Sequence, residues 1–164
     1  MADTGGGHRV LALDELLAAI HFRRASGAKV ALANGLFDIL HVGHLRYLEA
    51  ARREADILIV AVNGDACAAR LKGPGRPIVP AIERAELLAG FACVDYVTIF
   101  DDDTATRVIL AVKPDVHCKG TDYTAESVPE RDAVASYGGR VAIVGDPKSH
   151  ATRDLIEVIR GGAP

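Results

Sequence analysis

Short apolar runs alternate along the chain with segments in which apolar residues recur every three or four positions. The uninterrupted runs are typical of buried β-strands, and the three-to-four spacing is typical of amphipathic helices. The runs that predict strands are residues 29–34, 56–63, 95–100, 115–120 and 140–145. The segments that predict helices are residues 13–27, 43–55, 65–71, 81–91, 104–113, 128–138 and 152–160. Glycine and proline gather in residues 72–80, which predicts a loop there.

The alternating order of strands and helices predicts the fold class. Strands joined by helices form a parallel sheet covered on both faces, so we expect an α/β protein with a doubly wound, Rossmann-like sheet. Residues 1–8 are rich in glycine and predict a flexible tail, and residues 9–164 predict a single domain. Ligands of such sheets bind beyond the carboxyl ends of the strands. The polar stretches expected at that edge are residues 34–44, 63–65, 119–123 and 146–152.

Composition and charge narrow the class of partner. Lys and Arg number 19 against 22 Asp and Glu, giving a formal charge of −3, which argues against a nucleic-acid-binding surface. No apolar run approaches the ~18 residues of a membrane span, and the first residues lack a signal-peptide pattern. The three cysteines form no CxxC pair, which argues against a zinc ribbon or a disulfide framework. We expect a cytoplasmic protein that binds small molecules.

Two histidines, His41 and His44, lie at the start of a helix expected near Gly43, just after a predicted strand. A metal site is one interpretation, but no HExxH motif or cysteine cluster supplies further ligands, so we expect no metal held by protein residues. A buried structural pair is the second. An anion site is the third, because the N–H groups of a first helical turn attract phosphate and imidazole adds donors. Gly35 and Gly43 favour the anion site, since glycine lets the backbone approach a ligand.

Other motifs for phosphate binding or nucleophilic catalysis are missing from the sequence. There is no GxxxxGK[ST] loop, no GxGxxG fingerprint and no GxSxG elbow. An acidic run, Asp101 to Asp103, precedes the predicted helix 104–113. We interpret this run as the N-terminal cap of that helix rather than as a metal site.

The string "GLFDILHVGH", residues 35–44, resembles the G-x-F-D-x-x-H-x-G-H signature of the HxGH nucleotidyltransferase superfamily. Between Lys29 and Ile159 the chain resembles the heptose 1-phosphate adenylyltransferases, the transferase half of bifunctional heptose kinase/adenylyltransferases. The segments that carry this resemblance are "NGLFDILHVGH", "LKGPGRP" followed by "ER", "VDYV", and "KGTDY" followed by "YGGRV".

This resemblance implies a reaction and its partners. The reaction is transfer of AMP from ATP to a heptose 1-phosphate, which forms ADP-heptose and pyrophosphate for lipopolysaccharide or a related glycan. Mg²⁺ is expected on the phosphates of ATP, held mostly by substrate and water. A separate sugar kinase and a phosphatase are expected to supply the acceptor, and superfamily relatives suggest a homo-oligomer.

The resemblance also assigns roles to single residues. His41, His44 and Lys72 are expected to be catalytic, by stabilising the α-phosphoryl group and the departing pyrophosphate. The residues expected to contact the nucleotide are Asn34, Gly35, Phe37, Asp38, His41, His44, Lys119, Asp122 and Thr152. Phosphate or acceptor contacts are expected from Arg76, Arg84 and Arg153. Asp38 is also open to interpretation as a helix N-cap, and Arg84 as a salt-bridged surface residue.

A few positions depart from the family pattern. Thr121 stands where the heptose enzymes usually have glycine. Ala151, Thr152 and Arg153 stand where the superfamily usually has Ser-Thr-Thr, so the hydroxyl of Thr152 is kept and a cation enters at Arg153. Two alternatives therefore stay open: a cytidylyltransferase acting on glycerol 3-phosphate or another phospho-alcohol, and a nucleotide-binding regulator without turnover. Ala92 argues against the glycerol phosphate enzymes, which usually have arginine at that position.

Overall fold

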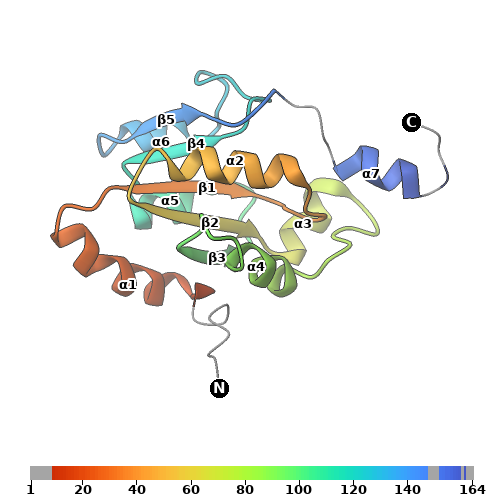
Figure 1. The fold of residues 1–164 in the computed structure, drawn as a ribbon, viewed down its shortest axis with the longest axis horizontal. Coiled ribbons are helices and arrows are strands. Elements are labelled where there is room, and N and C mark those ends of the chain that lie inside the picture. Colours follow the sequence, from red (N-terminus) through yellow and green to blue (C-terminus); the bar gives the residue numbers. More distant parts are fainter. Residues whose placement is uncertain (1–8, 148–151, 160, 162–164) are drawn as a thin grey trace.

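A five-stranded parallel sheet forms the centre of the protein (Figure 1). The structure, a computed structural model, describes residues 9–147, 152–159 and 161. The strands are β1 (Val30–Gly35), β2 (Ile57–Asn63), β3 (Tyr96–Phe100), β4 (Val116–Lys119) and β5 (Arg140–Ile143). They lie in the order β3-β2-β1-β4-β5, and every pairing is parallel. The α/β class and the doubly wound parallel sheet predicted from the sequence are confirmed.

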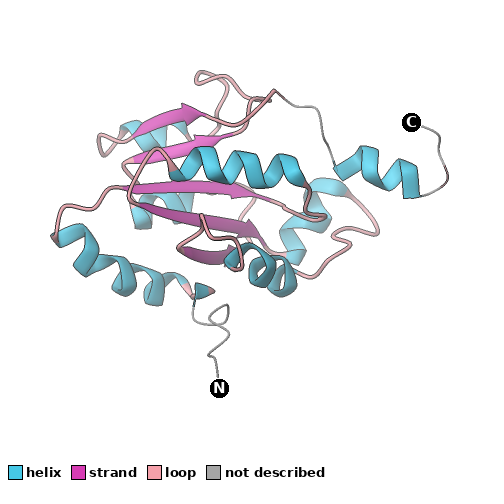
Figure 2. Ribbon diagram, viewed as in Figure 1, coloured by secondary structure: helices cyan, strands magenta, loops and turns pink. Residues whose placement is uncertain are grey.

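Helices connect the strands and cover both faces of the sheet (Figure 2). They are α1 (Leu13–Ala25), α2 (Val42–Arg52), α3 (Asp65–Lys72), α4 (Ala81–Ala89), α5 (Thr106–Val112), α6 (Arg131–Ala135) and α7 (Thr152–Ile159). Each falls within or close to a segment predicted to be helical. The helix expected near Gly43 begins at Val42.

Two apolar layers pack against the sheet, one on each face. Leu48 and Ala51 of α2 and Leu88 of α4 belong to one layer, and Leu16 of α1 and Ile109 of α5 belong to the other. Alternate residues of the central strands supply the opposing surfaces, because side chains along a strand point to opposite faces. The whole of β2 is buried, which explains why it is an unbroken apolar run.

The carboxyl end of β1 lies at the switch point of the sheet. β1 pairs with β2 on one side and with β4 on the other, so the connections leaving β1 and β3 run in opposite directions across the sheet. A crevice forms at such a point because neighbouring connections diverge to opposite faces. Asn34 at the end of β1, Asn63 at the end of β2 and Lys119 at the end of β4 therefore share this edge.

The acidic run Asp101 to Asp103 is not the cap of α5, and that prediction was wrong. The N-cap of α5 is Ala105, and no side chain caps the helix. Two of these aspartates pair with arginines instead. Asp102 accepts a hydrogen bond from Arg107 at 2.7 Å, and Asp103 accepts one from Arg70 at 2.9 Å. These ion pairs hold the carboxylates at the surface, and Thr104 and Ala105 separate Asp103 from the first residue of α5.

Parts of the prediction fall outside the described residues. These are the tail at residues 1–8 and Ala151 at the start of the last helix, together with the side chain of Arg153. Across residues 9–147 and 152–159, no helix has the length and apolar character needed to cross a membrane.

Candidate active site

A cavity of about 770 Å³ opens at the carboxyl edge of the sheet. Most of the residues predicted for the site line it: Asn34, Gly35, Phe37, Asp38, His41, His44, Lys72, Arg76, Lys119, Asp122 and Thr152. Arg84 does not belong to the lining. The structure thus brings together residues that are spread from β1 to α7 in the sequence.

The two histidines stand side by side at the N-terminus of α2. His41 is the N-cap, in an extended conformation, and His44 is in the first turn, so the two rings stack with centroids 3.9 Å apart. The backbone N–H of His41 donates to Nδ1 of His44 at 3.4 Å. In neutral His44 the proton is therefore on Nε2, because an Nδ1 that accepts a hydrogen bond carries none. The pair joins imidazole donors to a helix N-terminus at the cavity wall.

Phe37 and Gly35 shape the turn that leads from β1 to this helix. Phe37 is 4% exposed and has a φ of 51°, an uncommon conformation for an aromatic residue. Its ring meets the His44 ring edge-on, with centroids 5.2 Å apart. A Cβ at Gly35 would lie 3.1 Å from the Phe37 ring, so glycine allows this close packing. The turn is held against the histidines by aromatic packing.

Asp38 joins this turn to the loop that follows α3. Its carboxylate accepts hydrogen bonds from the backbone N–H groups of Ile78 and Val79, at 2.8 and 2.9 Å, and from the guanidinium of Arg76. The side chain of Asp38 is only 1% exposed. The N-cap interpretation of Asp38 was wrong, because His41 occupies the N-cap position. Asp38 instead fixes the segment that begins just after Lys72.

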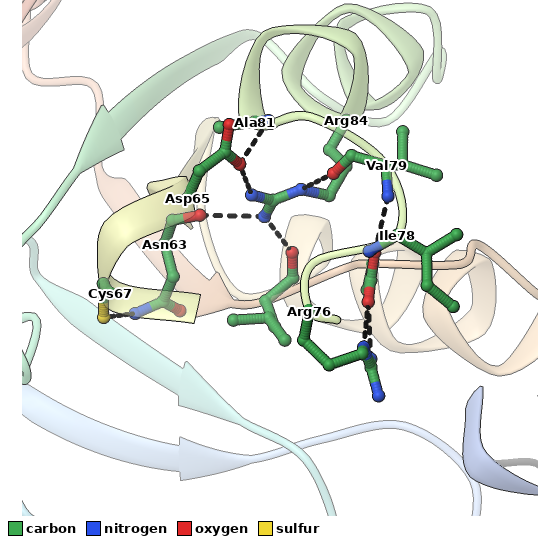
Figure 3. Close-up of polar contacts among 10 residues, drawn as sticks. Asn63, Asp65, Cys67, Arg76, Ile78, Val79, Ala81 and Arg84 are labelled. Atoms are coloured by element: carbon green, nitrogen blue, oxygen red, sulfur yellow. Dashed lines mark hydrogen bonds and ion pairs between the residues drawn. The ribbon is translucent and has the colours of Figure 1, made fainter. Parts of the chain in front are cut away.

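Arg84 supports the same region through several polar contacts (Figure 3). It is completely buried, so the interpretation of Arg84 as a surface residue was wrong. Its guanidinium donates to the backbone carbonyls of Leu36, Asn63 and Val79 and forms an ion pair with Asp65 at 2.8 Å. These acceptors come from the ends of β1 and β2 and from the loop before α4. A direct contact between Arg84 and phosphate remains a prediction. In the structure, Arg84 joins three segments through hydrogen bonds to their backbone carbonyls.

The floor of the cavity contains Lys119, whose Nζ donates to Oδ1 of Asn34 at 3.2 Å. The Nζ also lies 3.6 Å from the carboxylate of Glu130 and 4.8 Å from the centre of the Tyr123 ring. Burial lowers the pKa of Lys119, and the nearby charge of Glu130 opposes that effect. The ammonium is therefore partly neutralised by a carboxylate within the cavity itself.

Thr121, which departs from the family pattern, and Thr152, which keeps the hydroxyl of that pattern, both have local partners. The hydroxyl of Thr121 donates to the carbonyl of Asp146 at 2.9 Å, and Asp146 forms an ion pair with Arg46 of α2 at 3.2 Å. The hydroxyl of Thr152 donates to the carbonyl of Ile39 at 3.2 Å. Both hydroxyls thus tie loops to the cavity wall.

Sequence reasoning missed Glu130 and His117, which lie at the floor of the cavity or directly behind it. His117 is completely buried on β4, and its Nε2 lies 2.9 Å from Oδ1 of Asn34. Burial, reinforced by the charge of Lys119, lowers the pKa of His117 to about 4. An ionisable residue inside a buried strand was the available signal, since such groups need a partner. Glu130 gave no signal, because a glutamate at the start of a predicted helix is ordinary.

Comparisons with known proteins match most of the chain. The family model described as cytidylyltransferase-like matches residues 32–155. The bifunctional protein HldE of Ectopseudomonas mendocina is 48% identical over 158 residues, and that of Alkalilimnicola ehrlichii is 50% identical over 151 residues. The matches cover 96% and 92% of this chain but 33% and 32% of those proteins, so the chain spans about a third of their length.

Solved structures show the same fold. The lipopolysaccharide core biosynthesis protein from Thermoplasma volcanium superimposes with a TM-score of 0.60 at 30% identity, covering 71% of this chain and 94% of that chain. Pantothenate synthetase from Thermus thermophilus superimposes with a TM-score of 0.58 at 21% identity, covering 87% of this chain and 63% of that chain, and shows the fold alone. The histidine pair, the sheet and these matches lead to one conclusion: the chain belongs to the cytidylyltransferase-like family.

Proposed function

We propose that the protein is a nucleotidyltransferase that transfers AMP from ATP to a heptose 1-phosphate, with release of pyrophosphate. The observation that carries the reaction class is the stacked pair His41 and His44 at the N-terminus of α2, inside a cavity that Lys72 and Arg76 also line. The similarity to the HldE proteins supports the choice of a heptose phosphate and ATP.

The chemistry needs positioning and charge stabilisation rather than a strong base. An oxygen of the acceptor's phosphate attacks the α-phosphorus of ATP in line, a new P–O bond forms, and the bond to the β-phosphate oxygen breaks. The electrons of that bond leave with pyrophosphate, and no enzyme-bound intermediate is required. A phosphate monoester is already an anion near neutral pH, so it needs no deprotonation by the protein.

His41 and His44 supply the donors that such a reaction requires. The Nε2–H of His44 and the first-turn N–H groups of α2 can donate to oxygens of the α-phosphoryl group, whose charge redistributes as the leaving bond breaks. Lys72 is the last residue of α3 and lines the cavity, where its exposed ammonium can contact the departing pyrophosphate. Arg76 lies beside it but already pairs with Asp38, so we assign it to shaping the loop first.

The remainder of the cavity is assigned to the rest of the nucleotide and to the acceptor. Asn34, Gly35 and Phe37 come from the end of β1 and the turn after it, and we place the nucleotide against them. Asp122, which is exposed and also lines the cavity, suits the ribose hydroxyl groups as an acceptor. Thr152 and the side chain of Arg153, at the start of α7, belong to the phosphate region in this proposal.

We assign Mg²⁺ to the nucleotide rather than to a site made by protein residues. In the part of the chain that the structure describes, no three His, Cys, Asp or Glu side chains are grouped closely enough to hold a metal ion. We expect Mg²⁺ to arrive with ATP, where it would shield the β- and γ-phosphates. The acceptor requires a kinase acting on the anomeric position and a phosphatase, and we place the protein in the cytoplasm as a homo-oligomer.

The test is pyrophosphate release with each of the four nucleoside triphosphates against a panel of acceptors. The panel contains heptose 1-phosphate in both anomers, glycerol 3-phosphate and phosphoethanolamine. Release with ATP and one heptose 1-phosphate anomer would support the proposal. Release with CTP and a phospho-alcohol would overturn the proposed substrates and keep the reaction class. Binding of nucleotide without release for any pair would favour a regulator.

A further inference from the structure

A buried polar cluster forms the floor of the cavity on its β4 side. It consists of Asn34 on β1, His117 and Lys119 on β4, and Glu130 just before α6. His117 is 0% exposed, Glu130 3% and Lys119 7%. Burying two charges and two polar groups costs free energy unless they satisfy one another, so their arrangement is constrained.

The Asn34 side chain can be oriented in only one way within this cluster. Its Oδ1 lies 3.2 Å from Nζ of Lys119 and 2.9 Å from Nε2 of His117. An ammonium only donates, so the atom facing it must be the amide oxygen. His117 is neutral near pH 7 because its pKa is lowered to about 4, and its single ring proton must be on Nε2 to reach the same oxygen. Both contacts use Oδ1, which leaves the Nδ2 hydrogens of Asn34 for a ligand in the cavity that it lines.

Glu130 controls the position and the charge of Lys119. Oε1 of Glu130 accepts a hydrogen bond from the backbone N–H of Ala105 at 3.3 Å, which fixes the carboxylate to the loop before α5. Oε2 lies 3.6 Å from Nζ of Lys119 and has no hydrogen-bond partner among the described residues. The carboxylate thus faces Lys119, with Ala105 as its anchor on another wall of the cavity.

The cluster also sets the electrostatic character of this end of the cavity. The charges of Lys119 and Glu130 largely offset each other, and on the remaining lining Arg76 pairs with Asp38 and Arg46 pairs with Asp146, while Lys72 is exposed. A phosphate dianion binds best where a cation is not already paired, whereas a floor whose two charges offset each other suits a hydroxyl or carbonyl oxygen. The chemical class that we assign to the floor is therefore an uncharged oxygen of the nucleotide or of the sugar.

We propose that Glu130 is a positioning residue of the active site, which holds Lys119 against Asn34 so that the Asn34 amide stays turned to donate to an uncharged ligand oxygen. This inference rests on the proposed nucleotidyl transfer and adds to it. Glu130 acts through Lys119, so its loss must show in the protonation of Lys119 and not only in stability.

The first experiment follows the titration of Lys119 directly. The ¹³Cε signal of Lys119, assigned by its loss in Lys119→Gln, is measured against pH in the wild type, Glu130→Gln and Glu126→Gln. Burial lowers the pKa of Lys119, while the charges of Glu130 and Asp122 raise it, and His117 and Tyr123 complete its surroundings. Glu130→Gln should lower the titration midpoint by about one unit or more. Glu126→Gln, an exposed glutamate in the same connection, should leave it unchanged.

The second experiment links this titration to function. The kcat/KM of Glu130→Gln should fall at a lower pH than that of the wild type, because Lys119 loses its proton earlier, and Glu126→Gln should follow the wild type up to pH 9. Glu130→Asp, which restores the charge, should restore most of the activity at pH 9. In the Lys119→Gln background, Glu130→Gln should have little further effect.

Either of two results would overturn the inference. One is an unchanged titration midpoint of Lys119 in Glu130→Gln. The other is an equal loss of kcat/KM from Glu130→Gln with and without Lys119. If no acceptor gives turnover, the proposed function fails by itself, and ATP affinity measured calorimetrically replaces kcat/KM. An ATP affinity with the same pH dependence in Glu130→Gln and the wild type would then overturn the role of Glu130.

Discussion

Asp38 is the residue whose replacement tests the architecture of the site most directly. Asp38→Asn preserves shape and still offers one oxygen to the N–H groups of Ile78 and Val79. The other oxygen becomes an NH₂ group that faces the guanidinium of Arg76, so a donor meets a donor. The substitution therefore removes the ion pair and leaves the backbone contacts possible.

The expected cost follows from the burial of the pair. One charge-assisted hydrogen bond, from Nε of Arg76, is lost, worth about 1.5–3 kcal/mol, together with the ion-pair contact that Nη2 makes with the same oxygen. Arg76 is 21% exposed, so water recovers part of that loss, whereas Asp38, at 1%, recovers none. We expect the free energy of unfolding to fall by about 2–3 kcal/mol. Loosening the loop after Lys72 should also lower kcat about tenfold or more, because small displacements of catalytic groups are costly.

Urea denaturation and steady-state pyrophosphate release measure these two effects. The matched control is Asp102→Asn, which breaks the pair between Asp102 and Arg107, whose side chains are 44% and 66% exposed. That surface pair should contribute less than about 1 kcal/mol and should not affect kcat. If Asp38→Asn unfolds within about 0.5 kcal/mol of the wild type and keeps its kcat, the loop is not held by this carboxylate.

The remaining predictions concern the histidines and the buried arginine. His41→Ala and His44→Ala should each lower kcat by about 10²-fold or more with folding intact, and unchanged turnover in both would refute their assignment. Arg84→Met should destabilise the protein by about 3 kcal/mol or more in urea, because buried carbonyls of Leu36 and Asn63 lose their donor; a wild-type midpoint would contradict the bracing role. The lowered pKa of His117 means that the unfolded chain binds a proton that the folded chain does not. Its stabilising contribution is therefore complete above about pH 6.5 and is lost as pH falls toward 4, by about 3 kcal/mol, and His117→Asn should flatten the unfolding free energy measured over that range.

The order of strands and helices was predictable because each strand is a short apolar run. β2 is buried on both faces, so its sequence has to be apolar throughout, and the pattern identifies it without knowledge of its neighbours. The cavity lining could be anticipated for the same reason, since polar residues at the carboxyl ends of parallel strands share an edge. His41 and His44 were singled out by the whole string of residues 35–44 and by its place between a predicted strand and a predicted helix.

What the sequence did not predict depends on partners far away in the chain. The acceptors of Arg84 are mostly backbone carbonyls, which carry no residue-specific signal. Asp38 has the side chain of a helix cap, and only the tertiary structure places Ile78 and Val79 within its reach. Asp101 to Asp103 were wrongly predicted to cap α5 because the helix begins at Thr106, later than the position of these aspartates suggests.

The position of β1 between β2 and β4 also bears on the order in which the site is built. The contacts of Asp38 with the loop before α4 join residues 40 and 41 positions apart, whereas those of Asn34 with β4 join residues 83 and 85 positions apart. Doubling the length of a closed loop adds only about 0.6 kcal/mol of entropic cost, so the two halves of the cavity differ little in the free energy of closing their loops. We expect a larger difference in the rate of formation, because contacts between segments that are nearer in the sequence form faster. The half of the cavity beside the histidines therefore needs the shorter loop closure, and the floor that holds Lys119 needs the longer one.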